Sequence, residues 1–367
     1  MFDLYKNDNI DAVNAKFEAQ KIAFAPLSFQ AARALKNMGI LEEISKARKE
    51  GITISELAQK LEISPYGISV LVEMGLGMGA IKLHKDSDES DLRLTLGKIG
   101  FFLMSDNMTQ VNMNFVEDIC YRGAENLEES IRSGKPIGLQ HLGPWKTVYE
   151  GLSKLTNPQK KSWFGFDHFY SDLAFPEALP IVFENLAQNT SARLFDIGGN
   201  TAKWAIACCK YNSNIKISII DLPGQTEVAE KNAKAAGFKD RINTIPCNVL
   251  DETTKFPQDA DAIWMSQFLD CFSLKQITKI LKKIHSAITK ETDIYVLEPL
   301  WDKQRFEAAA YSLQATSLYF TCIANGNSKM YRYGELKNAI EIAGFELKEA
   351  HHNVGPNNYT LLRFRKK

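Results

Sequence analysis

Apolar residues recur at helical spacing through the first part of the chain. The stretch FAPLSFQAARALKNMGILEEI predicts helical structure within residues 1–50. The pattern then predicts a helix over 54–61 and, after a turn, a second helix that ends near Met74, where glycines begin. Two short strands, AIKLH and LRLT, flank a polar loop that follows. Helix, turn, helix and paired strands form a winged-helix order, which we assign to a mainly helical domain of residues 1–105.

Residues 106–180 are predicted to be mostly helical, with breaks at SGKP and LGP. This segment is rich in aromatic side chains, namely Phe115, Tyr121, Trp145, Tyr149, Trp163, Phe164, Phe166, Phe169 and Tyr170. Ordinary packing between helices explains most of them, and the others could line a site for a flat ligand. We therefore interpret the segment as a helical connector that contributes to a substrate pocket.

From residue 191 onward, predicted strands alternate with predicted helices. The strands are ARLFDIGG, KISIIDLP, RINTIPCNV, DAIWMSQFL and TDIYVLEPL, and a late segment ends in YTLLRFRKK. This regular alternation predicts an α/β fold with a parallel, doubly wound, Rossmann-like sheet over residues 181–367. Ligands of such sheets bind at the carboxyl ends of the strands.

Charge and composition narrow the choice of partners. Lys and Arg together number 44, as do Asp and Glu, so the formal net charge is zero. No Lys or Arg occurs between residues 61 and 81, where a DNA-reading helix would need cations, so we expect no nucleic-acid partner. The sequence has neither a secretory leader nor an apolar run of about 20 residues, which predicts a cytoplasmic protein with no membrane partner. The six cysteines are scattered without metal-ligand spacing.

The turn after the first strand of the α/β region is a candidate cofactor site. In LFDIGGNTAKW, Asp196 lies at the end of the strand, and Gly198, Gly199 and Asn200 form the turn. Glycine is needed where the backbone must approach a ligand closely. The dinucleotide fingerprint G-x-G-x-x-G does not fit, because the two glycines are adjacent. An acid two residues before the first glycine instead resembles the first motif of S-adenosylmethionine-dependent methyltransferases, whose loop passes beneath the methionine part of the cofactor.

The second strand also ends in an acid. In SIIDLPG, Asp221 is followed by Leu222 and stands where an acidic residue accepts the hydroxyls of an adenosine ribose. NAD enzymes share this feature, so it indicates an adenosine ribose and no single cofactor. The structural alternative for Asp221 is a helix N-cap.

The order of these elements resembles one family over nearly the whole chain. A winged-helix-like domain, a helical connector, GKP at 134–136, DIGG, DLP and AGF at 343–345 are similar to the small-molecule O-methyltransferases of the plant phenolic, caffeate type and their bacterial relatives. The resemblance implies S-adenosylmethionine as the cofactor and a hydroxyl of an aromatic or polyketide-like small molecule as the methyl acceptor. It also implies a homodimer built through the amino-terminal domain.

Several residues depart from the family pattern. Asn200 replaces a glycine of the usual GGGTG run, and asparagine tolerates the left-handed backbone better than most residues. Asn248 replaces the acid that accepts the adenine amino group, although an amide oxygen can accept the same hydrogen bond. The resemblance also places Val249 and Gln267 at the cofactor.

The most consequential departure concerns the catalytic base. The family's Leu-His-Asp-Trp stretch matches residues 269–272, so Asp270 stands where the family has its histidine. A solvated aspartate has a pKa of about 3.9 and is a poor base for a phenol near 10, but burial can raise that value. Glu298 matches the acid that orients the family's histidine, and its charge would raise the pKa of Asp270 further. His168, in the helix that contacts the substrate in the family, is an alternative base.

We therefore predict an S-adenosylmethionine-dependent O-methyltransferase with an atypical base. The alternative is a non-catalytic protein that keeps the fold and binds the cofactor or a small molecule in a regulatory role. It is motivated by the missing histidine and by the altered residue after the third strand.

Overall fold

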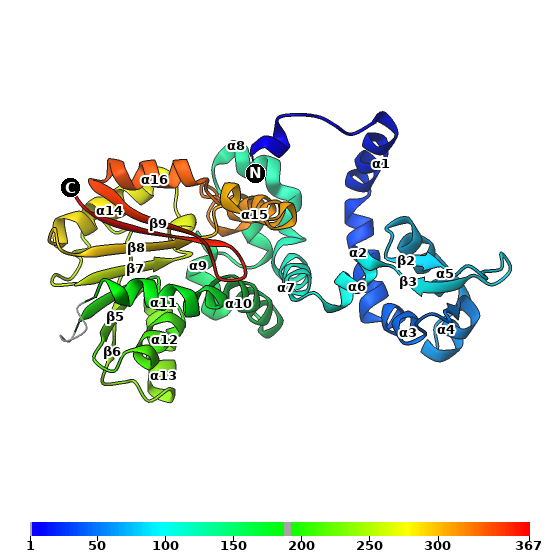
Figure 1. The fold of residues 1–367 in the computed structure, drawn as a ribbon, viewed down its shortest axis with the longest axis horizontal. Helices are drawn as coiled ribbons and strands as arrows, with labels where there is room; N and C mark the ends of the chain where they lie inside the picture. Colours follow the sequence, from blue (N-terminus) through cyan, green and yellow to red (C-terminus); the bar gives the residue numbers. More distant parts are fainter. Residues whose placement is uncertain (1, 187–191) are drawn as a thin grey trace. The chain divides into compact units, whose positions relative to one another are not determined.

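The computed structural model describes residues 2–186 and 192–367. The chain forms two compact units: an amino-terminal unit of Lys6–Val116, and a carboxyl-terminal unit of Glu117–Lys367 to which the first five residues also belong (Figure 1). The boundary at 116 and 117 lies inside the segment 106–180 that the sequence pattern marks as a connector. The division into domains 1–105, 106–180 and 181–367 stays a prediction.

The amino-terminal unit is mainly helical, as predicted, and contains a small antiparallel sheet of order β1-β3-β2. Its helices are α1 (Ala12–Ala23), α2 (Ala25–Asn37), α3 (Ile40–Lys46), α4 (Ile54–Leu61), α5 (Pro65–Gly77), α6 (Lys98–Ser105) and α7 (Asn107–Phe115), and its strands are β1 (Ile52–Thr53), β2 (Ile81–Leu83) and β3 (Arg93–Leu96). A capping box begins α4: the Thr53 hydroxyl accepts from the Glu56 amide, and the Glu56 carboxylate accepts from the Thr53 amide.

Two details of this unit differ from the sequence prediction. The strand β1 was not expected, and α5 does not end near Met74 but continues to Gly77. Gly75 stays inside the helix because the helix packs closely on β2 at this position. A Cβ on Gly75 would lie only 2.6 Å from the Cδ1 atom of Ile81. The glycine therefore permits close packing and does not end the helix.

The carboxyl-terminal unit contains the alternating strands and helices that the sequence predicts. Its helices are α8 (Leu127–Ser133), α9 (Val148–Gly151), α10 (Asn157–Ser171), α11 (Phe175–Glu184), α12 (Lys203–Tyr211), α13 (Pro223–Ala235), α14 (Leu274–Ala287), α15 (Glu307–Tyr319) and α16 (Tyr333–Ile342). Its strands are β4 (Arg193–Ile197), β5 (Lys216–Asp221), β6 (Ile242–Pro246), β7 (Ala262–Ser266), β8 (Asp293–Glu298), β9 (Phe345–Val354) and β10 (Tyr359–Lys366).

The seven strands form one sheet of order β6-β5-β4-β7-β8-β10-β9. Strands β4 to β8 are parallel, and β10 and β9 are added antiparallel, so the sheet is mostly parallel and not wholly so. The strand order reverses beside β4, whose neighbours are β5 and β7. Ligands of doubly wound sheets bind outside the carboxyl ends of the strands at such a reversal.

Helices cover both faces of this sheet (Figure 1). On one face, α14 and α16 pack against inward-facing residues such as Phe195, Met265 and Val296 in a continuous apolar core. On the other face, the indole of Trp204 in α12 stacks on that of Trp264 in β7, with ring centroids 3.8 Å apart. This burial of aromatic and aliphatic surface holds the strand ends in fixed positions.

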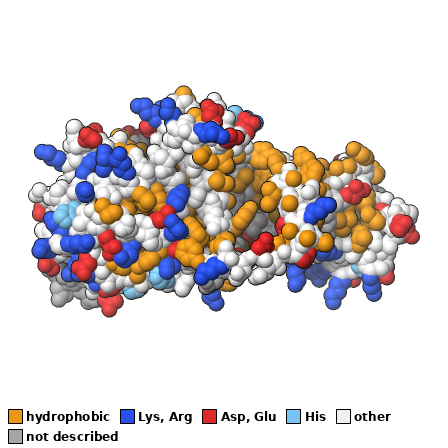
Figure 2. All heavy atoms as spheres, turned by 90° about the horizontal axis from the view of Figure 1, so that it is seen from above, with side chains coloured by type: hydrophobic (Ala, Val, Ile, Leu, Met, Phe, Trp, Pro, Cys, Tyr) orange, Lys and Arg blue, Asp and Glu red, His pale blue; other side chains and the backbone are white. Residues whose placement is uncertain are grey.

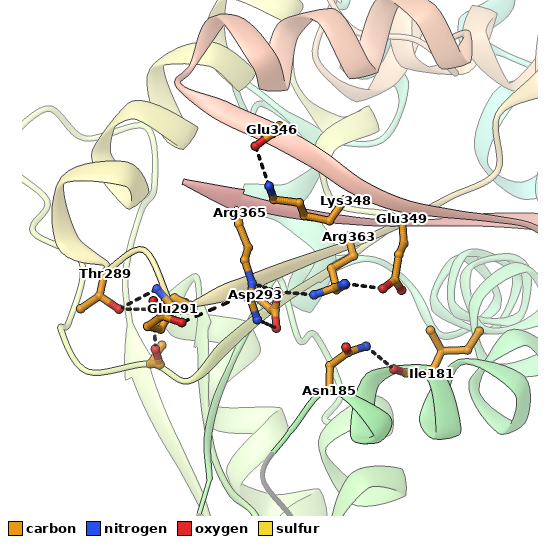
Figure 3. Close-up of polar contacts among 12 residues, drawn as sticks. Ile181, Asn185, Thr289, Glu291, Asp293, Glu346, Lys348, Glu349, Arg363 and Arg365 are labelled. Carbon is orange, nitrogen blue, oxygen red and sulfur yellow. Dashed lines mark hydrogen bonds and ion pairs between the residues drawn. The ribbon is translucent and has the colours of Figure 1, made fainter. Parts of the chain in front are cut away.

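An ion-pair network around the buried carboxylate of Asp293 joins the antiparallel strands to β8 (Figure 3). The carboxylate of Asp293 accepts from Arg363 Nη1 at 3.0 Å, and from Nε and Nη2 of Arg365 at 2.7 and 3.0 Å. Arg363 also pairs with Glu349 of β9. Asp293 is the first residue of β8, so the network lies at the opposite end of that strand from Glu298.

The surface carries exposed apolar residues in the amino-terminal unit. α1 has no buried residue, and Val13 and Phe17 are 79% and 50% exposed. On the face drawn in Figure 2, hydrophobic side chains lie exposed among charged side chains of both signs. Within the described ranges, no helix has the length and apolar character required to cross a membrane.

Candidate functional site

The turn between β4 and α12 has the backbone shape that the glycine motif predicts. Gly198, Asn200 and Ala202 have φ angles of 77°, 47° and 67°. A Cβ on Gly198 would lie 2.3 Å from the ring of Phe268, so only glycine fits there. Asn200 adopts the left-handed region, as expected of an asparagine at a former glycine position. Ala202 does so as well, at a cost that its packing must offset.

Two acids lie beside this turn. Asp196 is 2% exposed, and its Oδ2 atom has no hydrogen-bond partner among the described residues. Burial, reinforced by the nearby carboxylate of Asp221, raises the pKa of Asp196 to about 8. Asp221 Oδ2 accepts a hydrogen bond from the backbone amide of Asn200 at 2.9 Å, and Oδ1 accepts one from the backbone amide of Leu222 at 2.7 Å. Leu222 is the N-cap residue of α13, so Asp221 does not serve as the N-cap.

The other residues predicted to bind the cofactor follow β6 and β7. Asn248 is exposed, and its side-chain oxygen accepts a hydrogen bond from the backbone amide of Leu250 at 3.0 Å. The second lone pair of this oxygen can accept a further hydrogen bond. Val249 is buried in the core. Gln267 has a φ of 45°, and its Oε1 atom is buried without a partner in the described part of the chain. These residues thus follow the same edge of the sheet as the glycine turn.

Asp270 lies in a short 3₁₀ helix (Leu269–Cys271) that follows β7. Glu298, the last residue of β8, fixes the start of this helix: its Oε1 atom accepts the amide of Phe268 at 3.2 Å and that of Leu269 at 2.9 Å. The position of Asp270 is therefore set by a buried carboxyl group of the neighbouring strand. Glu298 thus positions Asp270 through the backbone amides that precede it.

Burial dominates the electrostatics of this pair. Asp270 is 4% exposed and Glu298 is 2% exposed. Burial raises the pKa of Asp270 to about 7, and the charge of Asp167 adds to this although hydrogen bonds from Cys271 oppose it. Burial, followed by the charge of Asp270, raises the pKa of Glu298 well above its usual range. Burial therefore favours the protonated form of Glu298, and Asp270 changes charge near pH 7.

His168 lies in α10 and faces the glycine turn. Its Nε2 atom is 3.3 Å from the hydroxyl of Thr201, and its Nδ1 atom is 3.3 Å from a carboxylate oxygen of Asp172. Burial lowers the pKa of His168, but the carboxylates of Asp172 and Asp167 outweigh it, so the pKa is raised. Both ring nitrogens already have partners, which favours a positioning role over that of a base.

Comparison with known protein families identifies the chain. Residues 16–88 match the Dimerisation2-like domain, and residues 180–346 match the O-methyltransferase domain. The chain thus combines a Dimerisation2-like domain with an O-methyltransferase domain. Members of this family depend on S-adenosylmethionine, and structural neighbours contain it, so the predicted cofactor is confirmed.

Two relatives with named activities are similar to this chain over most of its length. The L-tyrosine C(3)-methyltransferase of Streptomyces lavendulae is 22% identical over 328 residues, which cover 88% of this chain and 85% of that protein. The bacteriochlorophyllide d C-20 methyltransferase of Chlorobaculum tepidum is 20% identical over 346 residues, which cover 90% and 93%. Both are methyltransferases whose names specify a carbon acceptor.

Solved structures of the family have the same fold. The mitomycin 7-O-methyltransferase MmcR superposes with a TM-score of 0.69 at 16% identity, covering 97% of this chain and 98% of that one. NcsB1, an O-methyltransferase from neocarzinostatin biosynthesis solved with S-adenosylmethionine and 2-hydroxy-5-methyl naphthoic acid, gives 0.62 at 16% identity, covering 92% and 96%.

The residues of this chain fit the family's cofactor. The glycine turn has the left-handed backbone of the predicted motif, and Asp221, the last residue of β5, has further lone pairs available for ribose hydroxyls. The buried oxygens of Asp196 and Gln267 lack partners in the described protein, which is costly unless a ligand supplies one. The assignment of individual residues to the cofactor stays a prediction.

Sequence reasoning missed Asp167 and Tyr359 at this site, and it named Tyr149 only among the aromatic residues that could line a pocket. Asp167 of α10 accepts the side-chain amide of Asn200 at 3.0 Å. The hydroxyls of Tyr149 and Tyr359 are buried and have no hydrogen-bond partner among the described residues. Burial raises the pKa of both tyrosines, and the charge of Asp270 adds to the rise. A carboxylate within the aromatic stretch WFGFDHFY was the available signal for Asp167. Tyr359 lies in a strand and carries no comparable signal.

Proposed function

We propose that the protein transfers the methyl group of S-adenosylmethionine to a hydroxyl oxygen of an aromatic or polyketide-like small molecule, with Asp270 as the general base. The observation that supports this most is the position of Asp270: it is buried, it follows β7 beside the glycine turn, and its pKa is raised to about 7. A base is most effective when its pKa lies near the working pH.

Asp270 removes the hydroxyl proton as the oxygen forms its bond to the methyl carbon. The cofactor supplies the electrophilic methyl group on its sulfonium, and the carbon–sulfur bond breaks to leave neutral sulfur in S-adenosylhomocysteine. Holding oxygen, carbon and sulfur in line contributes several kcal/mol, on the order of what proximity provides in other enzymes. Glu298 keeps the base in place through the amides of Phe268 and Leu269.

A second candidate function is methylation of a ring carbon next to a phenol hydroxyl. It is favoured by the similarity to the L-tyrosine C(3)-methyltransferase over 88% of this chain. The same base would serve, because removing the phenol proton makes the neighbouring ring carbon nucleophilic. That carbon would bond to the methyl group and then lose its own proton, which restores the aromatic ring.

The deciding experiment combines binding with product analysis. Calorimetric titration with S-adenosylhomocysteine tests the cofactor site, and a panel of phenols is then incubated with trideuteromethyl-labelled cofactor. Mass spectrometry detects the transfer, and proton NMR of the product distinguishes an O-methyl group from a C-methyl group with loss of a ring proton. Binding without turnover of any phenol would favour the non-catalytic alternative.

The base is tested with two variants. We expect Asp270→Asn to lower kcat by about a hundredfold or more while the affinity for S-adenosylhomocysteine is unchanged. His168→Gln should lower kcat less, because both ring nitrogens of His168 contact other residues. Full activity in Asp270→Asn, together with a large loss in His168→Gln, would transfer the role of base to His168.

A further inference from the structure

Helix α10 contacts the cofactor turn through two consecutive residues. The Oδ2 atom of Asp167 accepts the side-chain amide of Asn200 at 3.0 Å, and His168 contacts Thr201. Asn200 is held from its other side by Gln225, whose Nε2 atom donates to the amide oxygen at 2.8 Å. The residue that replaces a family glycine is thus the one that joins the turn to α10.

The charge of Asp167 is balanced only in part by the neighbouring imidazole of His168. Among the described residues, no Lys or Arg forms an ion pair with Asp167, whereas its neighbour Asp172 lies 3.8 Å from Lys203. A neutral amide donor satisfies one oxygen of Asp167 without cancelling its charge. Burial raises the pKa of Asp167 to about 6; the charge of His168 and the hydrogen bond from Asn200 oppose the rise, and the carboxylates of Asp172 and Asp221 add to it. A ligand cation at this point would relieve the repulsion between these carboxylates.

The proposed function determines where such a cation would lie. If the ribose is held at Asp221 after β5 and methyl transfer occurs at Asp270 after β7, the cofactor crosses the turn after β4, because β4 lies between these strands. Asp167 is electrostatically coupled to both acids. The amino-acid arm, which branches from the sulfur, is the part of the cofactor that carries an ammonium group.

Asp196 is less suited to bind this ammonium group. Its pKa is raised to about 8, so it is mostly neutral at pH 7, whereas Asp167 is mostly ionised there. A Cβ on Gly199 would lie 2.7 Å from Asp196 Oδ2, which places Asp196 underneath the turn backbone. Its unpaired oxygen is a second sign that this turn is completed by a ligand.

We propose that Asp167 is a cofactor-binding residue that accepts a hydrogen bond from the α-ammonium group of S-adenosylmethionine, while Asn200 holds the carboxylate in place. The proposal rests on the proposed function for the position of the ribose and the sulfur. A carboxylate that accepts from an ammonium group forms a charge-assisted hydrogen bond, which is stronger than a neutral one. Binding of the amino-acid arm would thus depend on a residue outside the glycine motif.

Two ligands that differ only by this arm provide the test. S-adenosylhomocysteine carries the ammonium group, whereas 5′-methylthioadenosine keeps the adenosine and the thioether and lacks the amino acid. Calorimetry is performed on the full-length wild type and on Asp167→Asn. We expect the variant to bind S-adenosylhomocysteine about ten- to a hundredfold more weakly, and 5′-methylthioadenosine with unchanged affinity. Unchanged binding of the smaller ligand also shows that the variant is folded.

Asp172→Asn is the matched control, because it removes a carboxylate of the same region that already has Lys203 nearby. Its preference for S-adenosylhomocysteine over 5′-methylthioadenosine should equal that of the wild type. Equal loss of both ligands in Asp167→Asn would overturn the proposal and leave Asp167 with a purely structural role at the turn. If Asp167→Asn bound both ligands as tightly as the wild type, the proposal would also be overturned. In that case, a higher KM of the variant for methyl acceptors that carry an amino group, and for no others, would assign Asp167 to the acceptor site. Failure of the wild type to bind S-adenosylhomocysteine would instead refute the proposed function.

Discussion

At the residue scale, the environment of Asp270 explains how an aspartate can replace a histidine as a base. The two side chains differ by more than two pKa units in water, which is about 3 to 4 kcal/mol of proton affinity. Burial, with a contribution from the charge of Asp167, raises the pKa of Asp270 to about 7, near that of a free imidazole. The protein thus obtains the proton affinity of a histidine from the packing around a carboxylate.

This shift predicts the pH dependence of the reaction. Asp270 must be ionised to accept a proton, so kcat should fall about tenfold per pH unit below pH 7 and level off above it. Initial rates measured from pH 5 to 9 with saturating substrates would define the midpoint. A rate independent of pH down to pH 5 would mean that the base has an ordinary carboxylate pKa.

Two variants of Glu298 can distinguish its role as a hydrogen-bond acceptor from a role of its negative charge. Glu298→Gln retains an acceptor for the amides of Phe268 and Leu269 and resembles the neutral acid. We expect the Gln variant to keep most of kcat and to lose less than about 1 kcal/mol of unfolding free energy. Glu298→Ala leaves two buried amides without a partner and should lose about 2 to 5 kcal/mol.

Urea denaturation and steady-state kinetics of both Glu298 variants check this prediction. If the Gln variant lost as much kcat as the Ala variant, the reaction would require the negative charge of Glu298. That result would agree with the sequence-based prediction that this charge raises the pKa of Asp270.

The sequence predicts those parts of the site that lie on single motifs. Asp196 and Asp221 lie at the carboxyl ends of β4 and β5, and Asp270 follows β7; a doubly wound sheet brings such positions to one edge. Tyr149, Tyr359 and Asp167 reach the site from segments far apart in the chain, by packing that no local pattern encodes. The pKa values could not be predicted either, since they depend on the burial that this packing creates.

At the element scale, the strand β9 shows why periodicity can fail. Its sequence FELKEAHHNV is polar at most positions, because it is the edge strand of the sheet, and only its first and last residues are fully buried. The inner strand β10 is buried along most of its length and was recognisable as YTLLRFRKK. Local hydrophobicity identifies strands that are covered on both faces and overlooks those at an edge.

The ion-pair network around Asp293, at the start of β8, should contribute more to stability than an exposed ion pair of the same sheet. Asp293→Asn removes the charge that pairs with Arg363 and Arg365, so we expect a loss of about 1.5 to 3 kcal/mol in unfolding free energy. Glu346→Gln, which breaks the exposed pair with Lys348 shown in Figure 3, is the control and should cost less than about 1 kcal/mol.

Urea denaturation of both variants measures these losses. Because Asp293 and Glu298 are at opposite ends of β8, affinity for S-adenosylhomocysteine should be unchanged in the folded Asp293 variant. A loss equal to that of the control would show that desolvation of Asp293 cancels the attraction of the two arginines.

At the scale of the whole molecule, the amino-terminal unit has more apolar surface than a free monomer would favour. α1 buries none of its residues within the chain, although it carries Val13, Phe17 and Ile22. The match of residues 16–88 to the Dimerisation2-like domain offers an explanation. Because net charge is zero, no general repulsion opposes association of two copies.

We therefore propose a homodimer in which α1 lies at the contact between two copies. The double variant Val13→Asp/Phe17→Asp would place two carboxylates in that contact, and burying unpaired charge costs more than the apolar burial gains. We expect the wild type to have the mass of a dimer in multi-angle light scattering. The dissociation constant of the double variant should be at least about tenfold higher, which shifts its mass toward that of a monomer. Lys16→Glu, which changes an exposed charge on α1 and keeps its apolar side chains, is the control and should remain a dimer. A monomeric wild type, or a double variant that dimerises as tightly as the wild type, would contradict the role of α1 and require another explanation for its exposed apolar side chains.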